Sequence, residues 1–191
     1  KWSNGQMPTS GNTYATAYLL RTPESESSFT FAGDRLTLSP GGNFGIKSSG
    51  VLTVANFVLN GGAVSFGIQR TTPAFAGGLT VAAPSPIVIT DPGQRWLNIQ
   101  SPLSGTADLT LYVSDAEKRV FLTGGNTAFT GRLNVRGKGR LFIGSEENLG
   151  GNPAAYQTDQ LTFGGAALTA TNTFTLDDAN RGIRLDNTAA T

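Results

Sequence analysis

The residues of this chain that could do chemistry are carboxylates, because the sequence contains no histidine and no cysteine. Histidine-dependent triads, thiol catalysis and zinc sites with nitrogen or sulfur ligands are therefore excluded. A glycosidase needs two convergent carboxyl groups within about 10 Å of each other. The sequence predicts no such pair and hence no enzyme, because the separate aspartates lie in different turn contexts and share no repeated motif: Asp34, Asp91, Asp108, Asp115 and Asp159.

One local group of acidic residues has the composition of a weak calcium site. Asp177, Asp178 and Asp186 could supply the hard oxygen ligands that Ca²⁺ takes. The same segment is also typical of a turn, in which Arg181 and Arg184 supply the countercharge. We therefore expect no catalytic residue, no cofactor and no metal, with these three aspartates as the weak calcium candidate.

Two further features could be mistaken for binding sites. Several glycine pairs occur, but none precedes a Lys-Ser/Thr pair or opens a helix, so we expect chain corners rather than phosphate loops. Trp2, Trp96, Tyr112 and Tyr156 could stack on sugar rings, yet their spread along the chain favours a core or cap role. Residues 114–119 form the one dense charge cluster and are expected to be a solvated turn.

The elements that must position these residues are short strands. Apolar residues recur as dyads that place two side chains on one face of a strand, with glycine, serine or asparagine turns between them. Prolines bracket the strands, as expected for corners, and no stretch has helical periodicity. The clearest dyads are Phe29/Phe31, Leu36/Leu38, Phe44/Ile46, Leu52/Val54, Phe57/Leu59, Val64/Phe66, Leu79/Val81, Ile87/Ile89, Leu161/Phe163, Phe174/Leu176 and Ile183/Leu185.

A meander of hairpins would give the same local pattern, but similar strings recur along the chain. Gly-Val-Leu-Thr-Val begins at Gly50, Gly-Leu-Thr-Val at Gly78 and Gly-Arg-Leu-Asn-Val at Gly131. Recurrence of a strand-and-turn unit is typical of a solenoid. We therefore predict a single all-β domain, a parallel β-helix without substantial helix, with residues 1–28 as an N-terminal cap or arm and 29–191 as coils.

The composition agrees with a surface of strand faces and turns. The 191 residues include 25 glycines, and charged residues make up 14%, against about a quarter in an average domain. A net charge of +1 gives no reason to expect nucleic acid as a partner. No run approaches the roughly 20 apolar residues of a membrane-spanning helix. The absence of cysteine is compatible with export, because repeat folds bury enough surface without disulfides.

Residues 123–170 resemble a known repeat. Asn126-Thr-Ala-Phe-Thr-Gly-Arg-Leu-Asn-Val, followed by Gly139-Arg-Leu-Phe-Ile-Gly-Ser-Glu-Glu-Asn-Leu-Gly, is similar to the autotransporter-associated β-strand repeat. Ala128 and Arg132 depart from the usual pattern. The downstream Leu161-Thr-Phe-Gly-Gly-Ala-Ala-Leu is similar to a further segment of that repeat. The residues that carry the motif are Gly131, Leu133, Val135, Gly139, Leu141, Ile143, Gly144, Leu149, Gly150, Leu161, Phe163, Gly164, Gly165 and Leu168.

The resemblance implies a right-handed parallel β-helix from a secreted or cell-surface bacterial protein. The expected function is that of a non-catalytic stalk or adhesin module, located outside the cell, with flanking parts of a larger chain or identical subunits as partners and glycans or host surfaces as ligands. Two alternatives stay open. One is a subunit of a head-to-tail extracellular filament, and the other is a carbohydrate-binding or carbohydrate-cleaving β-helix.

Overall fold

The fold is known from a computed structural model, which describes residues 6–24, 27–66, 73–90 and 96–186. In these residues the chain forms strands β1 to β19 and one 3-10 helix, η1, of four residues. All named strand pairs are parallel, and an isolated antiparallel bridge joins Arg136 to Gly165. The predicted all-β parallel fold, without a helix longer than one turn, is confirmed.

The strands are short, and their bounds are β1 Thr13–Thr16, β2 Leu19–Arg21, β3 Phe29–Thr30, β4 Arg35–Leu38, β5 Asn43–Ile46, β6 Val51–Asn60, β7 Ala63–Phe66, β8 Ala74–Ala83, β9 Ser85–Ile89, β10 Trp96–Ile99, β11 Leu103–Gly105, β12 Leu109–Val113, β13 Arg119–Leu122, β14 Ala128–Phe129, β15 Leu133–Gly137, β16 Arg140–Ile143, β17 Gln157–Gly164, β18 Ala167–Ala170 and β19 Arg181–Asp186, with η1 at Glu146–Leu149 between β16 and β17.

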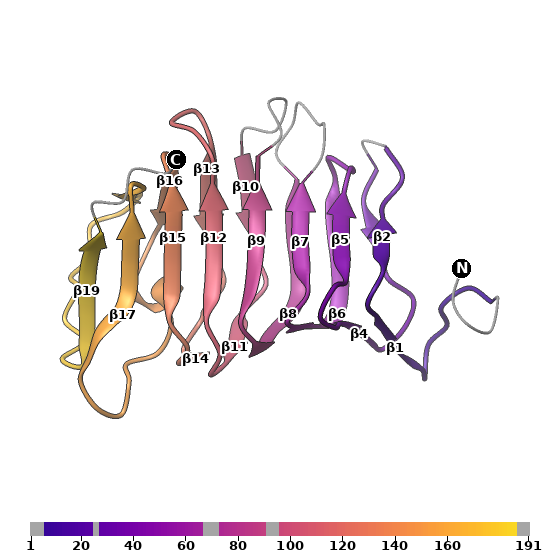
Figure 1. The fold of residues 1–191 in the computed structure, drawn as a ribbon, viewed down its shortest axis with the longest axis horizontal. Helices are drawn as coiled ribbons and strands as arrows, with labels where there is room; N and C mark the ends of the chain where they lie inside the picture. The colour runs from indigo at the N-terminus through magenta and orange to yellow at the C-terminus, as the bar shows by residue number, and fades with distance from the viewer. Residues whose placement is uncertain (1–5, 25–26, 67–72, 91–95, 187–191) are drawn as a thin grey trace.

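The coils are three-sided. Face 1 is the sheet β2-β5-β7-β9-β12-β15-β17-β19, whose strands stand side by side in Figure 1. The other sheet is folded into two faces, because β6 and β8 each run round a corner. Face 2 contains β3, the first halves of β6 and β8, and then β10, β13, β16 and β18. Face 3 contains β1, β4, the second halves of β6 and β8, and then β11 and β14.

The chain winds in a right-handed sense through about seven turns, and the coils are stacked along one axis from the N-terminal end to β19. The length of a coil varies. Asn43 pairs with Ala63, which is 20 residues later, whereas Leu133 pairs with Leu161, which is 28 residues later. Extra residues lie in the corners, because the strand register fixes the length of the faces but not of the connections.

One column of inward side chains runs the whole length of face 1. Strand register pairs each member with the next: Leu20, Phe44, Val64, Ile87, Leu111, Val135, Phe163 and Leu185. The six internal members are buried, whereas Leu20 is half-buried and Leu185 is 79% exposed. Each internal side chain stacks on one coil above and one below, which the two end members cannot do.

The predicted inward dyads are confirmed for the internal coils. Each of Leu36, Leu38, Leu52, Val54, Phe57, Leu59, Leu79, Val81, Ile87 and Ile89 is at most 4% exposed. The terminal dyads differ, since Leu176, Ile183 and Leu185 are exposed and Phe174 is half-buried. Their strands belong to the last described coil, which has a neighbour on one side only.

The recurring strings do not mark the coil. Leu52 lies on face 2, Leu79 on face 3 and Leu133 on face 1, so the three strings are not stacked on each other. What repeats in the sequence is one strand with its corner, about a third of a coil. The strings predict the solenoid but not its register.

Residues 13–21 of the expected cap or arm form β1 and β2, which pair in parallel with β4 and β5. They are the end strands of their sheets among the described residues. In Figure 1 the segment before β1 extends beyond the end of the stack. Trp2, at the start of that segment, lies outside the described residues.

Candidate functional site

The residues of the repeat motif lie in the two coils from β14 to β18, where they form walls and corners rather than a pocket. Leu133, Val135, Leu141, Ile143 and Leu161 are each at most 1% exposed and point into the core. The remaining motif residues include buried corner glycines, half-buried Gly144 and Leu168, and exposed Gly165. The motif therefore specifies packing, and none of these side chains carries a reactive group.

Gly131 shows why a corner of this coil requires glycine. An added Cβ would overlap the carbonyl oxygen of Ala107 on the preceding coil and lie 2.7 Å from its carbonyl carbon. The backbones of neighbouring coils therefore meet at this corner with no room for a side chain. Gly105 has a second reason, because its φ of +107° is one that side chains with a Cβ rarely adopt.

Two buried asparagines close the corner between face 2 and the next strand of each coil. Asn126 is 0% exposed, and its Oδ1 accepts the Leu103 N–H at 2.8 Å while its Nδ2 donates to the Asn148 carbonyl at 2.6 Å. Asn148 Nδ2 donates to the Gly124 carbonyl at 2.9 Å. These bonds run between coils, so they satisfy backbone groups that no strand ladder pairs.

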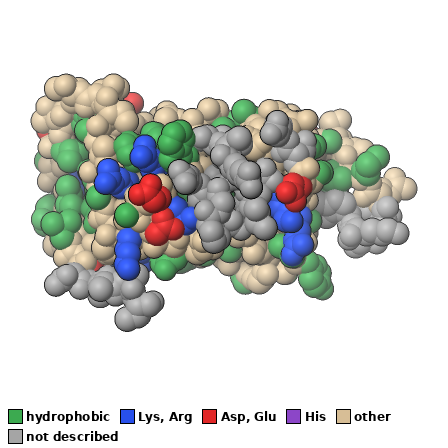
Figure 2. All heavy atoms as spheres, turned by 90° about the horizontal axis from the view of Figure 1, so that it is seen from above, with side chains coloured by type: hydrophobic (Ala, Val, Ile, Leu, Met, Phe, Trp, Pro, Cys, Tyr) green, Lys and Arg blue, Asp and Glu red, His purple; other side chains and the backbone are tan. Residues whose placement is uncertain are grey.

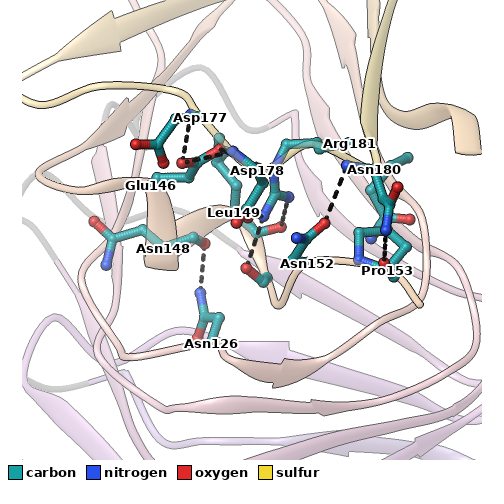
Figure 3. Close-up of polar contacts among 12 residues, drawn as sticks. Asn126, Glu146, Asn148, Leu149, Asn152, Pro153, Asp177, Asp178, Asn180 and Arg181 are labelled. Atoms are coloured by element: carbon teal, nitrogen blue, oxygen red, sulfur yellow. Dashed lines mark hydrogen bonds and ion pairs between the residues drawn. The ribbon is translucent and has the colours of Figure 1, made fainter. Parts of the chain in front are cut away.

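A buried arginine fastens β19 to the preceding coil (Figure 3). The Arg181 side chain is 1% exposed, and its guanidinium donates to the carbonyls of Leu149 at 3.2 Å and Gly150 at 2.9 Å. It also contacts two carboxylates, that of Glu146 at 3.3 Å and that of Asp178. The charge is thus paired twice and bonded to backbone, which is what a buried cation requires.

The aspartates of the calcium candidate are divided between two arginines. Asp178 pairs with Arg181, while Asp186 accepts a hydrogen bond from Arg184 Nε at 2.6 Å. Asp177 contributes its backbone N–H, which donates to Glu146 at 2.8 Å. Across the described residues, no three acidic side chains lie close enough to hold a metal ion. The segment is therefore the turn that was the alternative to a calcium site, and arginines supply its countercharge.

The expected solvated turn at residues 114–119 is wrong in one respect, because the Lys118 side chain is only 2% exposed. Its ammonium lies 3.3 Å from the carboxylate of Asp115, which also accepts the Glu117 N–H at 3.1 Å. Partial burial alone would raise the pKa of Asp115, but the hydrogen bonds from Lys118 and the Glu117 backbone outweigh it and lower the pKa. The turn is held by an ion pair whose cation packs inside the coil.

Figure 2 looks onto the loops that join face 1 to face 2, and acidic and basic side chains lie next to each other there. The ion pairs of these loops agree, with Lys118 beside Asp115 and Lys47 3.9 Å from Glu24. The described charged side chains of this face are therefore of mixed sign.

Aromatic residues form a ladder on the outside of face 2. Phe121 and Phe142 stack with centroids 4.7 Å apart, and the Arg119 guanidinium lies over Trp96 at 5.1 Å and over Phe142 at 5.7 Å. Trp96 is still 40% exposed. Because the rings cover one another and the guanidinium covers the indole, this ladder stabilises the outer face of the sheet.

The other two aromatic candidates lie elsewhere. Tyr112 is half-buried on the outside of β12, and Tyr156 is 65% exposed before β17. The three described aromatic candidates, Trp96, Tyr112 and Tyr156, are therefore not brought together as one sugar-binding platform, and Trp2 lies outside the described residues. Asp91 lies outside them, and the remaining isolated aspartates pair with cations where a partner is within reach, as Asp108 and Asp159 do with Arg132.

Three buried polar side chains were not identified from the sequence. They belong to Lys118, Gln160 and Arg181, each of which is next to an apolar or glycine-rich strand segment. Gln160 Nε2 donates to the Gly131 carbonyl at 2.8 Å and so supports the same tight corner. Lys118 and Arg181 had a signal, because each has the alternation parity of inward residues that follow it, Val120 and Ile183, whereas Gln160 had none.

The described chain is a right-handed parallel β-solenoid, with a continuous apolar core and polar side chains that close its corners. No membrane-spanning helix is found in the described residues. Comparison with protein-family models, curated proteins and solved structures finds no match. The resemblance to the autotransporter-associated repeat therefore stays a prediction.

Proposed function

We propose that the chain is a non-catalytic structural module, a stiff stalk within a secreted or cell-surface bacterial repeat protein. The observation that carries this proposal is the unbroken inward column of face 1, from Leu20 to Leu185. A rod that is filled by packed side chains along its length bends little, because interiors at native density resist deformation. Such a rod keeps whatever it carries at a fixed distance from its attachment.

Three further properties support this role. The coils need no disulfide, since the chain has no cysteine. Buried Asn126, Asn148 and Arg181 bond to backbone or to opposite charges and so stabilise corners, whereas Gln160 bonds through Nε2 and its buried Oε1 has no partner among the described residues. The two described carboxylate pairs that share a cation, Asp108 with Asp159 on Arg132 and Glu146 with Asp178 on Arg181, are held in ion pairs.

The stiffness can be measured with spin labels, because the cysteine-free chain permits specific labelling. Asn43 on β5 and Arg184 on β19 belong to one outward column of face 1, six strand spacings apart. At about 4.8 Å per spacing their backbones are roughly 29 Å apart. We expect Asn43→Cys/Arg184→Cys to give one narrow distance distribution, and a broad one would contradict a stiff stalk.

The location is tested with antibodies against the folded module on cells of the producing organism. Labelling of intact cells, or recovery of the protein from the medium, is the expected result. Recovery only after lysis would overturn the proposal. Release of reducing sugars from common polysaccharides, abolished by a single Asp or Glu substitution, would equally overturn the non-catalytic assignment.

A further inference from the structure

The two ends of the solenoid carry most of its exposed large apolar side chains. Tyr18 and Leu19 are 81% and 49% exposed at the N-terminal end, while Ile183 and Leu185 are 46% and 79% exposed at the C-terminal end. Met7, which precedes β1, is 84% exposed. Exposed apolar residues that gather at particular places mark interaction sites rather than ordinary surface.

The ends also carry strand edges with matching direction. Among the described strands, β2 is the outermost strand of face 1 at one end and β19 is the outermost at the other. All strands of this face are parallel, so the free edge of β19 has the polarity that a strand placed before β2 would have. Such edges pair with other chains unless they are blocked.

Register makes the match specific. The inward column that begins at Leu20 on β2 ends at Leu185 on β19, with no shift along the way. The next residues on the two strands are Arg21 and Asp186, both on the outer side of the face. A coil that continues the stack in register would therefore place a leucine on a leucine, and it would add Arg21 as a second cation beside Asp186, which already accepts a hydrogen bond from Arg184.

We propose that a second copy of this chain docks head to tail, with its β19 parallel to β2 of the first copy in that register. Leu185 then contacts Leu20, and the carboxylate of Asp186 lies beside the guanidinium of Arg21. The strands are separated by the ordinary spacing of about 4.8 Å. Face 1 thereby continues across the junction, because β2 and β19 are its outermost described strands.

The N-terminal end has room for the incoming side chains. A cavity of about 250 Å³ opens among the inward residues of the first two coils. Its apolar lining includes Leu20, Phe29, Phe31, Leu36, Phe44 and Leu52. Ile183 and Leu185 are the apolar side chains that the opposite end presents to it.

Other registers are disfavoured by charge and by side-chain direction. A shift of one residue would turn Leu185 to the outside of the face. A shift of two residues, with Ile183 opposite Leu20, would place Arg184 beside Arg21. The complementarity is thus a property of the chain's own two ends, which is why the occupant is a second copy rather than an unrelated protein.

The contact is heterologous, because the two copies use different surfaces. One copy's free ends can each bind a further copy, so the products form a series of lengths rather than a closed dimer. This inference depends on the end coils and not on the proposed stalk role, and a stalk protein that stays monomeric would leave that role intact.

The test compares five variants with the 191-residue chain by sedimentation velocity over a wide concentration range, with electron microscopy of the largest species. Leu185→Asp removes the apolar contact between the two copies. Because Leu185 is 79% exposed, the melting temperature of this variant should match that of the parent. Arg21→Asp and Asp186→Arg each place like charges together at the junction. The double variant Arg21→Asp/Asp186→Arg restores an opposite pair. Tyr156→Asp is the matched control, because it introduces the same charge at another exposed large apolar residue one coil in from the end.

We expect the parent and Tyr156→Asp to form monomers, dimers, trimers and longer rods as concentration rises. Leu185→Asp should abolish the series, each single charge variant should weaken association about fivefold, and the double variant should recover it. A parent that is monomeric at all concentrations overturns the proposal. So does a closed dimer, or association that Leu185→Asp leaves unchanged.

Discussion

Gly131 offers the sharpest test of how tightly the coils pack. In Gly131→Ala the new Cβ would overlap the Ala107 carbonyl oxygen and lie 2.7 Å from the carbonyl carbon and 3.0 Å from Phe129 Cε2, where ordinary contacts begin at 3.4 Å. Backbone of the preceding coil must move, because the obstacle is not the end of a flexible side chain. Overpacking of this kind costs about 3 kcal/mol. For a domain of this size the melting temperature should fall by roughly 6–12 °C.

Gly125→Ala is the control, since Gly125 lies in the same coil and an added Cβ meets nothing within 4 Å. Its φ is outside the left-handed region, so alanine should leave stability unchanged or raise it by about 0.4–1 kcal/mol through the unfolded state. Thermal melts by circular dichroism, with urea unfolding as a second measure, compare the two variants. If both variants melt like the parent, the close approach at Gly131 is wrong, and so is its role as a corner of the repeat.

Three further predictions concern buried side chains. Leu133→Asp places an unpaired charge in the inward column and should cost several kcal/mol; a parent-like melting curve would refute the inward assignment. Arg181→Met leaves Glu146 without its buried cation, so hydrogen exchange should accelerate in β19 while the central strands stay protected, and uniform acceleration would argue against a local effect. The lowered pKa of Asp115 means that this carboxylate contributes stability above its unfolded pKa, which is lost as the pH falls through the folded value. Lys118→Met should raise the Asp115 pKa in an NMR titration, and an unchanged pKa would contradict the ion pair.

The inward pattern of this fold could be predicted from the sequence because a strand shows every second residue to the core. Leu133 and Val135 are buried, as are Leu141 and Ile143, and each pair was identified from alternation alone. Alternation does not reveal which strands are neighbours. Because a coil here consists of three strand-and-corner units of variable length, similar strings recur on different faces.

The buried charges could not be predicted, because burial of a polar residue depends on partners distant in the sequence. Arg181 is paired with Glu146, 35 residues away, and bonds to two carbonyls of the preceding coil. Lys118 has its acidic partner only three residues away. Alternation places Lys118 on the inward side with Val120, and Arg181 on the inward side with Ile183, but their charged side chains argue against burial, and the partners that permit it become visible only when the coils are stacked.

Whether an inward side chain is buried or exposed therefore depends on the position of its coil in the stack. An inward leucine such as Leu133 is fully buried because coils lie on both sides of it, whereas Leu185, in the same kind of position, is exposed because one neighbour is missing. Arg181 attaches the last described coil to η1 through an ion pair with Glu146. In the internal coils, apolar contacts on both sides hold each coil in place. In a solenoid, stability is a sum over neighbouring repeats, so the end coils gain the most from another repeat. In the last described coil, Arg181 and its two carboxylates therefore attach β19 to the preceding coil, beside the exposed Ile183 and Leu185.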